Sequence, residues 1–257
     1  MTPLHRLDVA AFTNAISQDS IAIARLAAHT PLESDIPTCP GWKVRHLLSH
    51  LTYVHSWAAA YITTGRTSQL PELKEEEIFL AMPEDTELIP AFAAGAAALV
   101  DALRNAPDNI SCWTFLDAPT PLHFWARRQC HETAVHRGDL EAVAGTICSI
   151  PPAQACDGID ELLAGFAGRR ERLTATAPAA VLAVSTDEEH QAWLIQLEGR
   201  RISVLDTMRA ADCTISGSAS DLFFLLWNRL APDNCAVVVQ GDPRVLDQWK
   251  STMRVHW

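Results

Sequence analysis

The chain is short of positive charge, with 20 Lys and Arg residues against 31 Asp and Glu and a formal net charge of −11 at pH 7. Proteins that bind nucleic acid or anionic membranes usually carry basic patches that neutralise phosphates. Basic residues here stand next to each other only in pairs, so we expect neither a nucleic acid partner nor a membrane partner. The acidic run at residues 74–79 is too short for an interaction tail and predicts a solvated face or loop.

The sequence also lacks any Cys-x-x-Cys pair. Its seven cysteines are scattered and odd in number, which argues against a disulfide framework and against a zinc cluster built from thiolates. We expect most of them to be small buried hydrophobic residues.

Targeting and membrane-spanning features are absent from the sequence pattern. Residues 1–12 lack the basic start and apolar core of a signal peptide, and no run approaches about 18 consecutive apolar residues. The apolar segment at 91–103 is too short to span a bilayer and predicts a buried helix. We therefore expect a cytoplasmic protein.

The first 150 residues carry the apolar spacing of helices. The pattern predicts four of them, over residues 6–28, 43–63, 88–105 and 122–146, the last ending at Gly145. Residues 1–150 are therefore predicted to form a helical bundle.

Residues 151–257 have a different texture, beyond a boundary indicated by two prolines and a glycine in the segment 147–158. A helix is expected at 157–174, followed by four short alternating runs, a helix within 218–230, a fifth strand at 235–241 and a last helix at 243–253. Strands and helices at this spacing indicate a smaller α+β domain. The predicted fold class is α+β, with a four-helix bundle followed by this domain.

The strongest chemical signal lies in the fourth predicted helix. At about 100° per residue, Trp125, Glu132, His136, Leu140 and Val143 form one stripe, with Glu132 and His136 one turn apart. A buried carboxylate is costly unless it is paired or bound to a metal. Two interpretations stay open. In the first, Glu132 is paired within the protein, either by a hydrogen bond to a histidine or by an ion pair with Arg127 or Arg128. In the second, Glu132 and His136 together bind a metal, as Glu and His residues do in other helical bundles.

The segment HETAVH at 131–136 resembles the zincin motif but has one residue too many. His131 and His136 are five apart and therefore about 140° apart around the helix, so they cannot hold one metal together. His131 is interpreted as a packing or supporting residue. The second predicted helix offers His46, His50 and His55 as a third ligand, and helix geometry alone does not choose among them.

Two segments resemble motifs of the mycothiol-dependent maleylpyruvate isomerase family, which belongs to the DinB-like helical-bundle superfamily. TCPGWKVRHLLSHL, from residue 38, is similar to the family's CPGW-x-V-x-x-L-x-x-HL, and RRQCHETAVHRGDLEA, from residue 127, is similar to R-R-x-x-HE-x-AVHR-x-D-x-E. SGSASDLFFLLWNRL, from residue 216, looks more loosely like G-x-x-x-DL-x-x-x-LWGR. The resemblance covers most of the chain.

This resemblance implies a zinc ion, or another divalent first-row metal, bound by His50, Glu132 and His136. Two imidazoles and one carboxylate leave the fourth tetrahedral position open, as catalytic zinc requires. A thiol that enters this position loses its proton to the metal. The implied thiol is mycothiol, a cosubstrate that reacts with an electrophilic or unsaturated small molecule.

Residues outside the ligand set also have expected roles. Arg229 holds the position of a family arginine implicated in catalysis or substrate binding, and Asn228 replaces the usual glycine before it. Asp139 is expected to pair with Arg137 or to accept a hydrogen bond from a ligand imidazole. Cys39 is interpreted as a turn and packing residue rather than a nucleophile.

Three functions follow from these expectations. The first is thiol-assisted cis–trans isomerisation, as in maleylpyruvate isomerase. The second is transfer or exchange of mycothiol on an electrophile in detoxification or natural-product biosynthesis. The third is a non-enzymatic ligand-binding protein in which the metal only stabilises the bundle.

Overall fold

The computed structural model describes residues 7–253 except for 72, 168–178, 200 and 208. The described chain forms a helical N-terminal domain and an α+β C-terminal domain, which confirms the predicted fold class. The two compact units meet in sequence between Cys148 and Ser149, close to the boundary predicted at residue 150.

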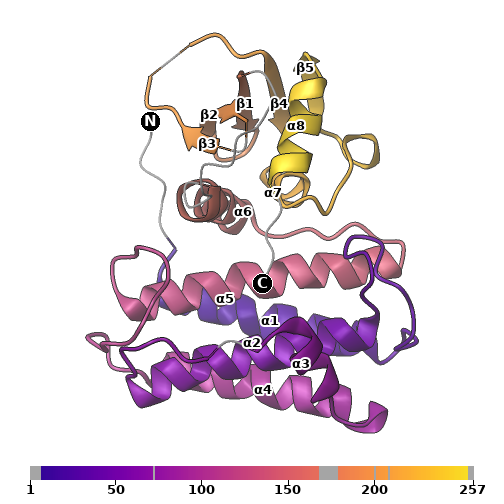
Figure 1. The fold of residues 1–257 in the computed structure, drawn as a ribbon, viewed down its shortest axis with the longest axis vertical. Helices are drawn as coiled ribbons and strands as arrows, with labels where there is room; N and C mark the ends of the chain where they lie inside the picture. Colours follow the sequence, from indigo (N-terminus) through magenta and orange to yellow (C-terminus); the bar gives the residue numbers. More distant parts are fainter. Residues whose placement is uncertain (1–6, 72, 168–178, 200, 208, 254–257) are drawn as a thin grey trace. The chain divides into compact units, whose positions relative to one another are not determined.

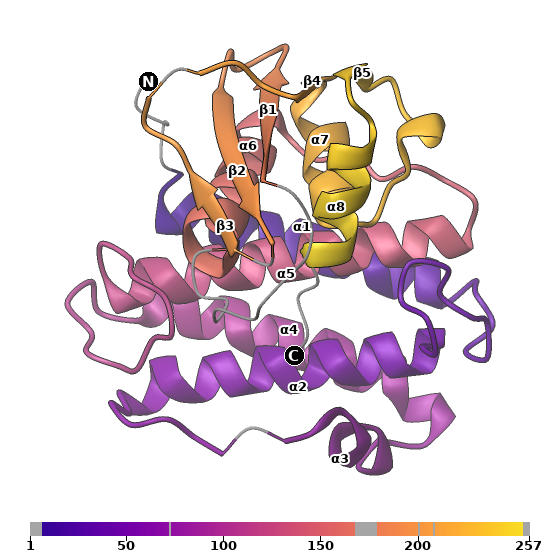
Figure 2. The same ribbon diagram turned by 45° about the horizontal axis from the view of Figure 1, so that its top comes forward.

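Four long helices build the N-terminal unit: α1 (Val9–Ala27), α2 (Val44–Thr64), α4 (Asp85–Asn105) and α5 (Pro121–Val143). Both α1 and α2 pack against α4 and α5, as Figures 1 and 2 show from two sides. The four predicted helices are confirmed, with ends that differ by a few residues. Gly145 follows the end of α5 with a φ of +71°, a left-handed conformation typical of the residue after a helix.

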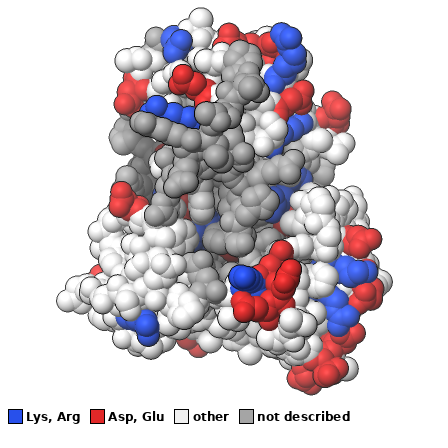
Figure 3. Space-filling view, in the orientation of Figure 1, with Lys and Arg blue, Asp and Glu red and all other residues white. Residues whose placement is uncertain are grey.

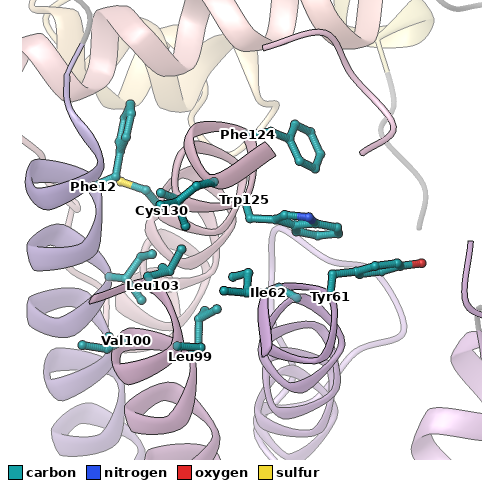
Figure 4. Packing of buried hydrophobic residues seen from close by; sticks show 14 of the residues in the cluster. Phe12, Tyr61, Ile62, Leu99, Val100, Leu103, Phe124, Trp125 and Cys130 are labelled. Carbon is teal, nitrogen blue, oxygen red and sulfur yellow. The ribbon is translucent and has the colours of Figure 1, made fainter. Parts of the chain in front are cut away.

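The interior of the bundle is filled by large apolar side chains from all four helices. Figure 4 shows Phe12 of α1, Tyr61 of α2, Leu99 of α4 and Trp125 of α5 in one cluster. The rings of Tyr61 and Trp125 stack with their centroids 4.9 Å apart. Full burial of one such aliphatic or aromatic side chain contributes about 1.5–3 kcal/mol, so this cluster is a major source of the bundle's stability.

Helix α4 contains the apolar segment predicted as a buried helix. Among the described helices, it alone is long and apolar enough to cross a membrane by length and composition. Its side chains Leu88, Phe92, Leu99 and Leu103 are buried in the bundle, but only 39% of its apolar window is buried, so the helix predicted as buried is partly exposed.

The acidic run forms a short helix, α3 (Glu75–Leu80), where the sequence suggested only a solvated face or loop. Its acidic residues Glu75, Glu76 and Glu77 are exposed, as predicted, and Figure 3 shows acidic side chains gathered over this helix. Three carboxylates in the first turn favour a helix start because they oppose the partial positive charge there.

The C-terminal unit is built on a five-stranded mixed sheet in the order β3-β2-β1-β4-β5. The strands are β1 (Ala180–Thr186), β2 (Ala192–Glu198), β3 (Arg201–Val204), β4 (Cys213–Gly217) and β5 (Val238–Gly241). Strand β1 pairs with β4 in parallel, whereas the other three pairings are antiparallel. Helix α7 (Ala219–Leu226) packs against β1 and β4, and α8 (Arg244–Thr252) packs against β1.

The helix predicted at 157–174 begins earlier in the structure, at Pro152. Helix α6 (Pro152–Asp160) begins inside the segment interpreted as a boundary, because proline is tolerated in the first helical turn, where its missing N–H costs nothing. It continues as a π-helix over Glu161–Phe166. Residues 168–174 of the predicted helix lie outside the described residues.

Replacing Leu99 by Ala should lower the free energy of unfolding of the helical unit by about 2–5 kcal/mol, because it leaves a cavity at a fully buried position. Leu80, which is 87% exposed, is the matched control, and Leu80→Ala should change stability by no more than about 0.5 kcal/mol. Urea unfolding followed by circular dichroism measures both. Equal losses in the two variants would contradict the placement of this core.

Candidate metal centre

Three side chains from two helices converge in the interior of the bundle. His50 comes from α2, and Glu132 and His136 come from adjacent turns of α5. The Nε2 atoms of His50 and His136 lie 2.8 Å and 3.2 Å from the same carboxylate oxygen, Oε1 of Glu132. One potential ligand atom from each residue lies within 4.8 Å of the other two, and each residue is only 2% exposed.

This arrangement fits a metal ion. Two imidazole nitrogens and one carboxylate oxygen aimed at a common point match the ligand types of zinc sites that keep a position open for substrate. The same donors also suit other first-row divalent ions. The structure therefore brings together the three residues that the sequence analysis named as ligands.

The second oxygen of Glu132 has a different partner. The Arg128 guanidinium donates a hydrogen bond of 3.1 Å to Oε2, and both side chains are almost fully buried. The ion pair and the Glu–His contact considered from the sequence are thus both present. They are compatible with a metal, because Arg128 leaves Oε1 turned toward the two histidines.

Asp139 contacts the nitrogen of the His136 ring that does not face Glu132. The Nδ1 atom of His136 lies 2.8 Å from Oδ2 of Asp139, so the ring's other nitrogen, Nε2, faces Glu132. The alternative prediction, a pair between Asp139 and Arg137, stays a prediction, and the Arg137 guanidinium forms ion pairs with Asp19 and Glu141. Arg137 lies two residues before Asp139 on α5, so its side chain leaves the helix on a different side.

The segment before α2 contacts this support directly. Thr38 donates a hydrogen bond of 2.6 Å to Oδ1 of Asp139, and the Cys39 thiol donates to Oδ2 at 3.3 Å. The indole of Trp42 stacks on the His136 ring at 5.8 Å and lies 5.0 Å from His50. The Cys39 thiol therefore lies against Asp139, and its assignment to packing rather than to nucleophilic attack stays a prediction. The link from Thr38 and Trp42 to the ligands was missed, although both lie in or beside the CPGW motif.

The other histidines of these helices point elsewhere. His55 lies 3.0 Å from the Thr133 hydroxyl and its ring is 5.9 Å from that of Phe92. His46 stacks on Phe79, and His131 meets the ring of Phe12 edge-on. The structure thus distinguishes His50 from His46 and His55, and it separates His131 from His136 as the helical angle predicted.

The electrostatic surroundings of Glu132 favour the charged form of its carboxylate. Burial raises the pKa of Glu132, but the hydrogen bonds from His136 and His50 and the charge of Arg128 together hold this pKa well below its usual value. Burial outweighs the Glu132 contact for His50 and lowers the pKa of that imidazole. Burial would also lower the pKa of His136, but its bonds to Asp139 and Glu132 raise it to about 9.

Arg229 lies in the C-terminal unit, where it is partly buried and donates to the Trp227 carbonyl at 3.0 Å. Asn228, which replaces the expected glycine, adopts a left-handed φ of +58°. Asparagine tolerates this conformation better than most residues. The Arg229 amide then bonds the Phe224 carbonyl at 2.7 Å and caps α7, so the local backbone keeps the shape that a glycine would provide.

Comparison with known proteins agrees with the motifs. The N-terminal domain profile of mycothiol maleylpyruvate isomerase matches residues 14–141, and the C-terminal domain profile of the same proteins matches residues 153–248. Two crystal structures of mycothiol-dependent maleylpyruvate isomerase, one of them a histidine-to-alanine mutant, resemble this chain with TM-scores of 0.63 and 0.65. Sequence identity is 16% and 14%, and both comparisons cover 92% of this chain and 95% of the other. No curated protein matches the sequence.

The raised pKa of His136 predicts a pH dependence of stability in the metal-free protein. A group whose pKa rises on folding, here from 6.5 to about 9, stabilises the fold fully below pH 6.5 and loses this contribution as the pH approaches 9. The free energy of unfolding should therefore fall between pH 6.5 and 8, by up to about 1.4 kcal/mol per pH unit. Urea unfolding with a chelator present measures this slope. His136→Gln should flatten it, and an equal slope in the variant would contradict the assignment.

Proposed function

Because the chain belongs to the mycothiol maleylpyruvate isomerase family, we propose that it is a metal-dependent enzyme that uses mycothiol as an activated thiol. His50, Glu132 and His136 would hold one divalent ion, with zinc as the best candidate. The observation that carries this proposal is the convergence of three buried ligand atoms within 4.8 Å of one another.

A zinc ion bound there would supply an open coordination position and would lower the pKa of a thiol that enters it. The protein contributes the surroundings of this position. Arg128 fixes the Glu132 carboxylate, and the low exposure of the three ligands limits competition from water. The protein's own cysteines are not required as nucleophiles.

The reaction step that this arrangement supports is addition of the thiol sulfur to an electrophilic or unsaturated carbon. In an isomerase, rotation about the resulting single bond and departure of the thiol would give the trans product. In a transferase, the carbon–sulfur bond would persist, and the substrate would either take up the proton that the thiol lost or release a leaving group. Both reactions need the same thiol activation, and they differ in whether the thiol leaves again.

Arg229 is the candidate for holding a carboxylate of the second substrate. A guanidinium offers a planar pair of donors that matches a carboxylate group. The left-handed Asn228 and the bond from the Arg229 amide to Phe224 fix the backbone from which this side chain extends.

The metal assignment predicts stoichiometric zinc in the purified protein and its loss in His50→Ala and Glu132→Ala, since either change removes one of three ligands. His46→Ala is the matched control, because His46 lies one turn away on α2 and stacks on Phe79 instead. Elemental analysis by mass spectrometry gives the metal content. Full retention of metal in the His50 or Glu132 variant would remove that residue from the site.

The thiol assignment predicts turnover when the metal-loaded protein meets mycothiol and an unsaturated diacid such as maleylpyruvate. His50→Ala should lower the rate by about 100-fold or more, because metal activation is worth several kcal/mol. Mass spectrometry separates the two reactions: a stable adduct indicates transfer, and an isomer without an adduct indicates isomerisation. Metal bound by protein ligands alone, with no reaction of any electrophile tested, would contradict the proposal and favour a ligand-binding protein.

A further inference from the structure

We propose that Asp139 is a positioning residue of the metal centre and that Thr38 and Cys39 hold it in place. The segment from Thr38 to Trp42 would then belong to the support of the centre, beyond its part in starting α2. This inference rests on the proposed function, because it concerns the ion that His136 would bind.

The carboxylate of Asp139 is fully buried and is contacted by His136, Cys39 and Thr38. Its Oδ2 lies 2.8 Å from Nδ1 of His136 and 3.3 Å from the Cys39 thiol, and its Oδ1 accepts from the Thr38 hydroxyl at 2.6 Å. An ionised carboxylate only accepts hydrogen bonds, so the proton of a neutral His136 ring must sit on Nδ1. The lone pair on Nε2, which faces Glu132 and His50, is then the one available to a metal.

The support spans a large separation in the sequence. Thr38 and Asp139 are 101 residues apart, and they join the loop before α2 to the ligand-bearing face of α5. The loop is itself closed by backbone hydrogen bonds between Ile36 and Trp42 and between Cys39 and Trp42. Gly41 makes this turn possible with a φ of +90°, which other residues rarely adopt.

The loop also orients the ligands through Trp42. Its indole is nearly parallel to the His136 ring, at an interplanar angle of 9°, and it contacts His50 at an angle of 57°. His136 is therefore fixed on its edge by Asp139 and on its face by Trp42. A ring held in this way needs little further ordering when it binds an ion, so loss of the support should weaken metal binding.

The first test is Asp139→Asn, measured as zinc affinity by chelator competition. The amide is neutral and has one acceptor oxygen where the carboxylate has two, so it loses the charge-assisted hydrogen bond to the His136 imidazole and no longer accepts from Thr38 at the second position. We expect zinc to bind about 10–100-fold more weakly. Asp19→Asn is the matched control. Asp19 of α1 is also a buried carboxylate, and its partner is Arg137 of α5 rather than one of the three proposed ligands. It should keep an affinity close to that of the unchanged protein.

The second test removes the donors and leaves the carboxylate. The double variant Thr38→Val with Cys39→Ala should weaken zinc by up to about tenfold. Thr38→Ser with Cys39→Ser restores a hydroxyl donor at each position and should bind zinc almost normally. A purely structural role of the loop would not produce this rescue by donor chemistry.

A third measurement needs no metal. In the metal-free protein, the Nδ1 proton that His136 shares with Asp139 should give a strongly deshielded proton NMR signal, separate from any signal of the imidazole nitrogens that face Glu132. This signal should persist in Asp19→Asn and disappear in Asp139→Asn and His136→Gln.

The outcomes separate this inference from the proposed function. Normal zinc affinity in Asp139→Asn, with loss in His50→Ala, would overturn the positioning role and leave the metal site standing. Equal weakening in Asp19→Asn and Asp139→Asn would also overturn it, because the effect would then come from general destabilisation. Zinc binding by none of the proteins, including the unchanged one, would overturn the proposed function and this inference together.

Discussion

The organising constraint of this protein is a carboxylate buried inside a helical bundle. Glu132 is 2% exposed, and its charge is stabilised by Arg128 on one oxygen and by His50 and His136 on the other. Burying a charge without partners costs far more than the net stability of a domain allows. The packing of α2 against α5 must therefore keep these groups in register, and the same register brings together three side chains that could hold a metal.

Much of the fold and part of the site could be predicted from the sequence because their signals are local. Helical periodicity located the bundle helices and placed Glu132 and His136 one turn apart on α5. Periodicity could not choose His50, because the turn of α2 that faces Glu132, 82 residues further along the chain, depends on how α2 and α5 pack. The family motif supplied that choice. The contact between Thr38 and Asp139 was missed for the same reason, and α6 was placed late because its first proline was interpreted as a break.

The family likeness and the geometry support different parts of the functional argument. Identities of 14% and 16% with the solved isomerase structures show a shared fold, and a fold hosts more than one reaction. The buried group of His50, Glu132 and His136 could hold a metal, and it therefore supports the proposal of metal-assisted chemistry. What distinguishes an isomerase from a transferase is the fate of the thiol after addition, and this depends on the second substrate rather than on the ligands.

The distribution of the ligands over two helices has a consequence for the life of the protein in a cell. An ion shared by His50 and Glu132 would act as a reversible cross-link that closes a loop of 82 residues. Any ion that binds only the folded chain also shifts the folding equilibrium in proportion to its supply. Protein made under zinc starvation would then unfold more often. Proteases would degrade the unfolded chain, so its amount would fall in addition to its activity.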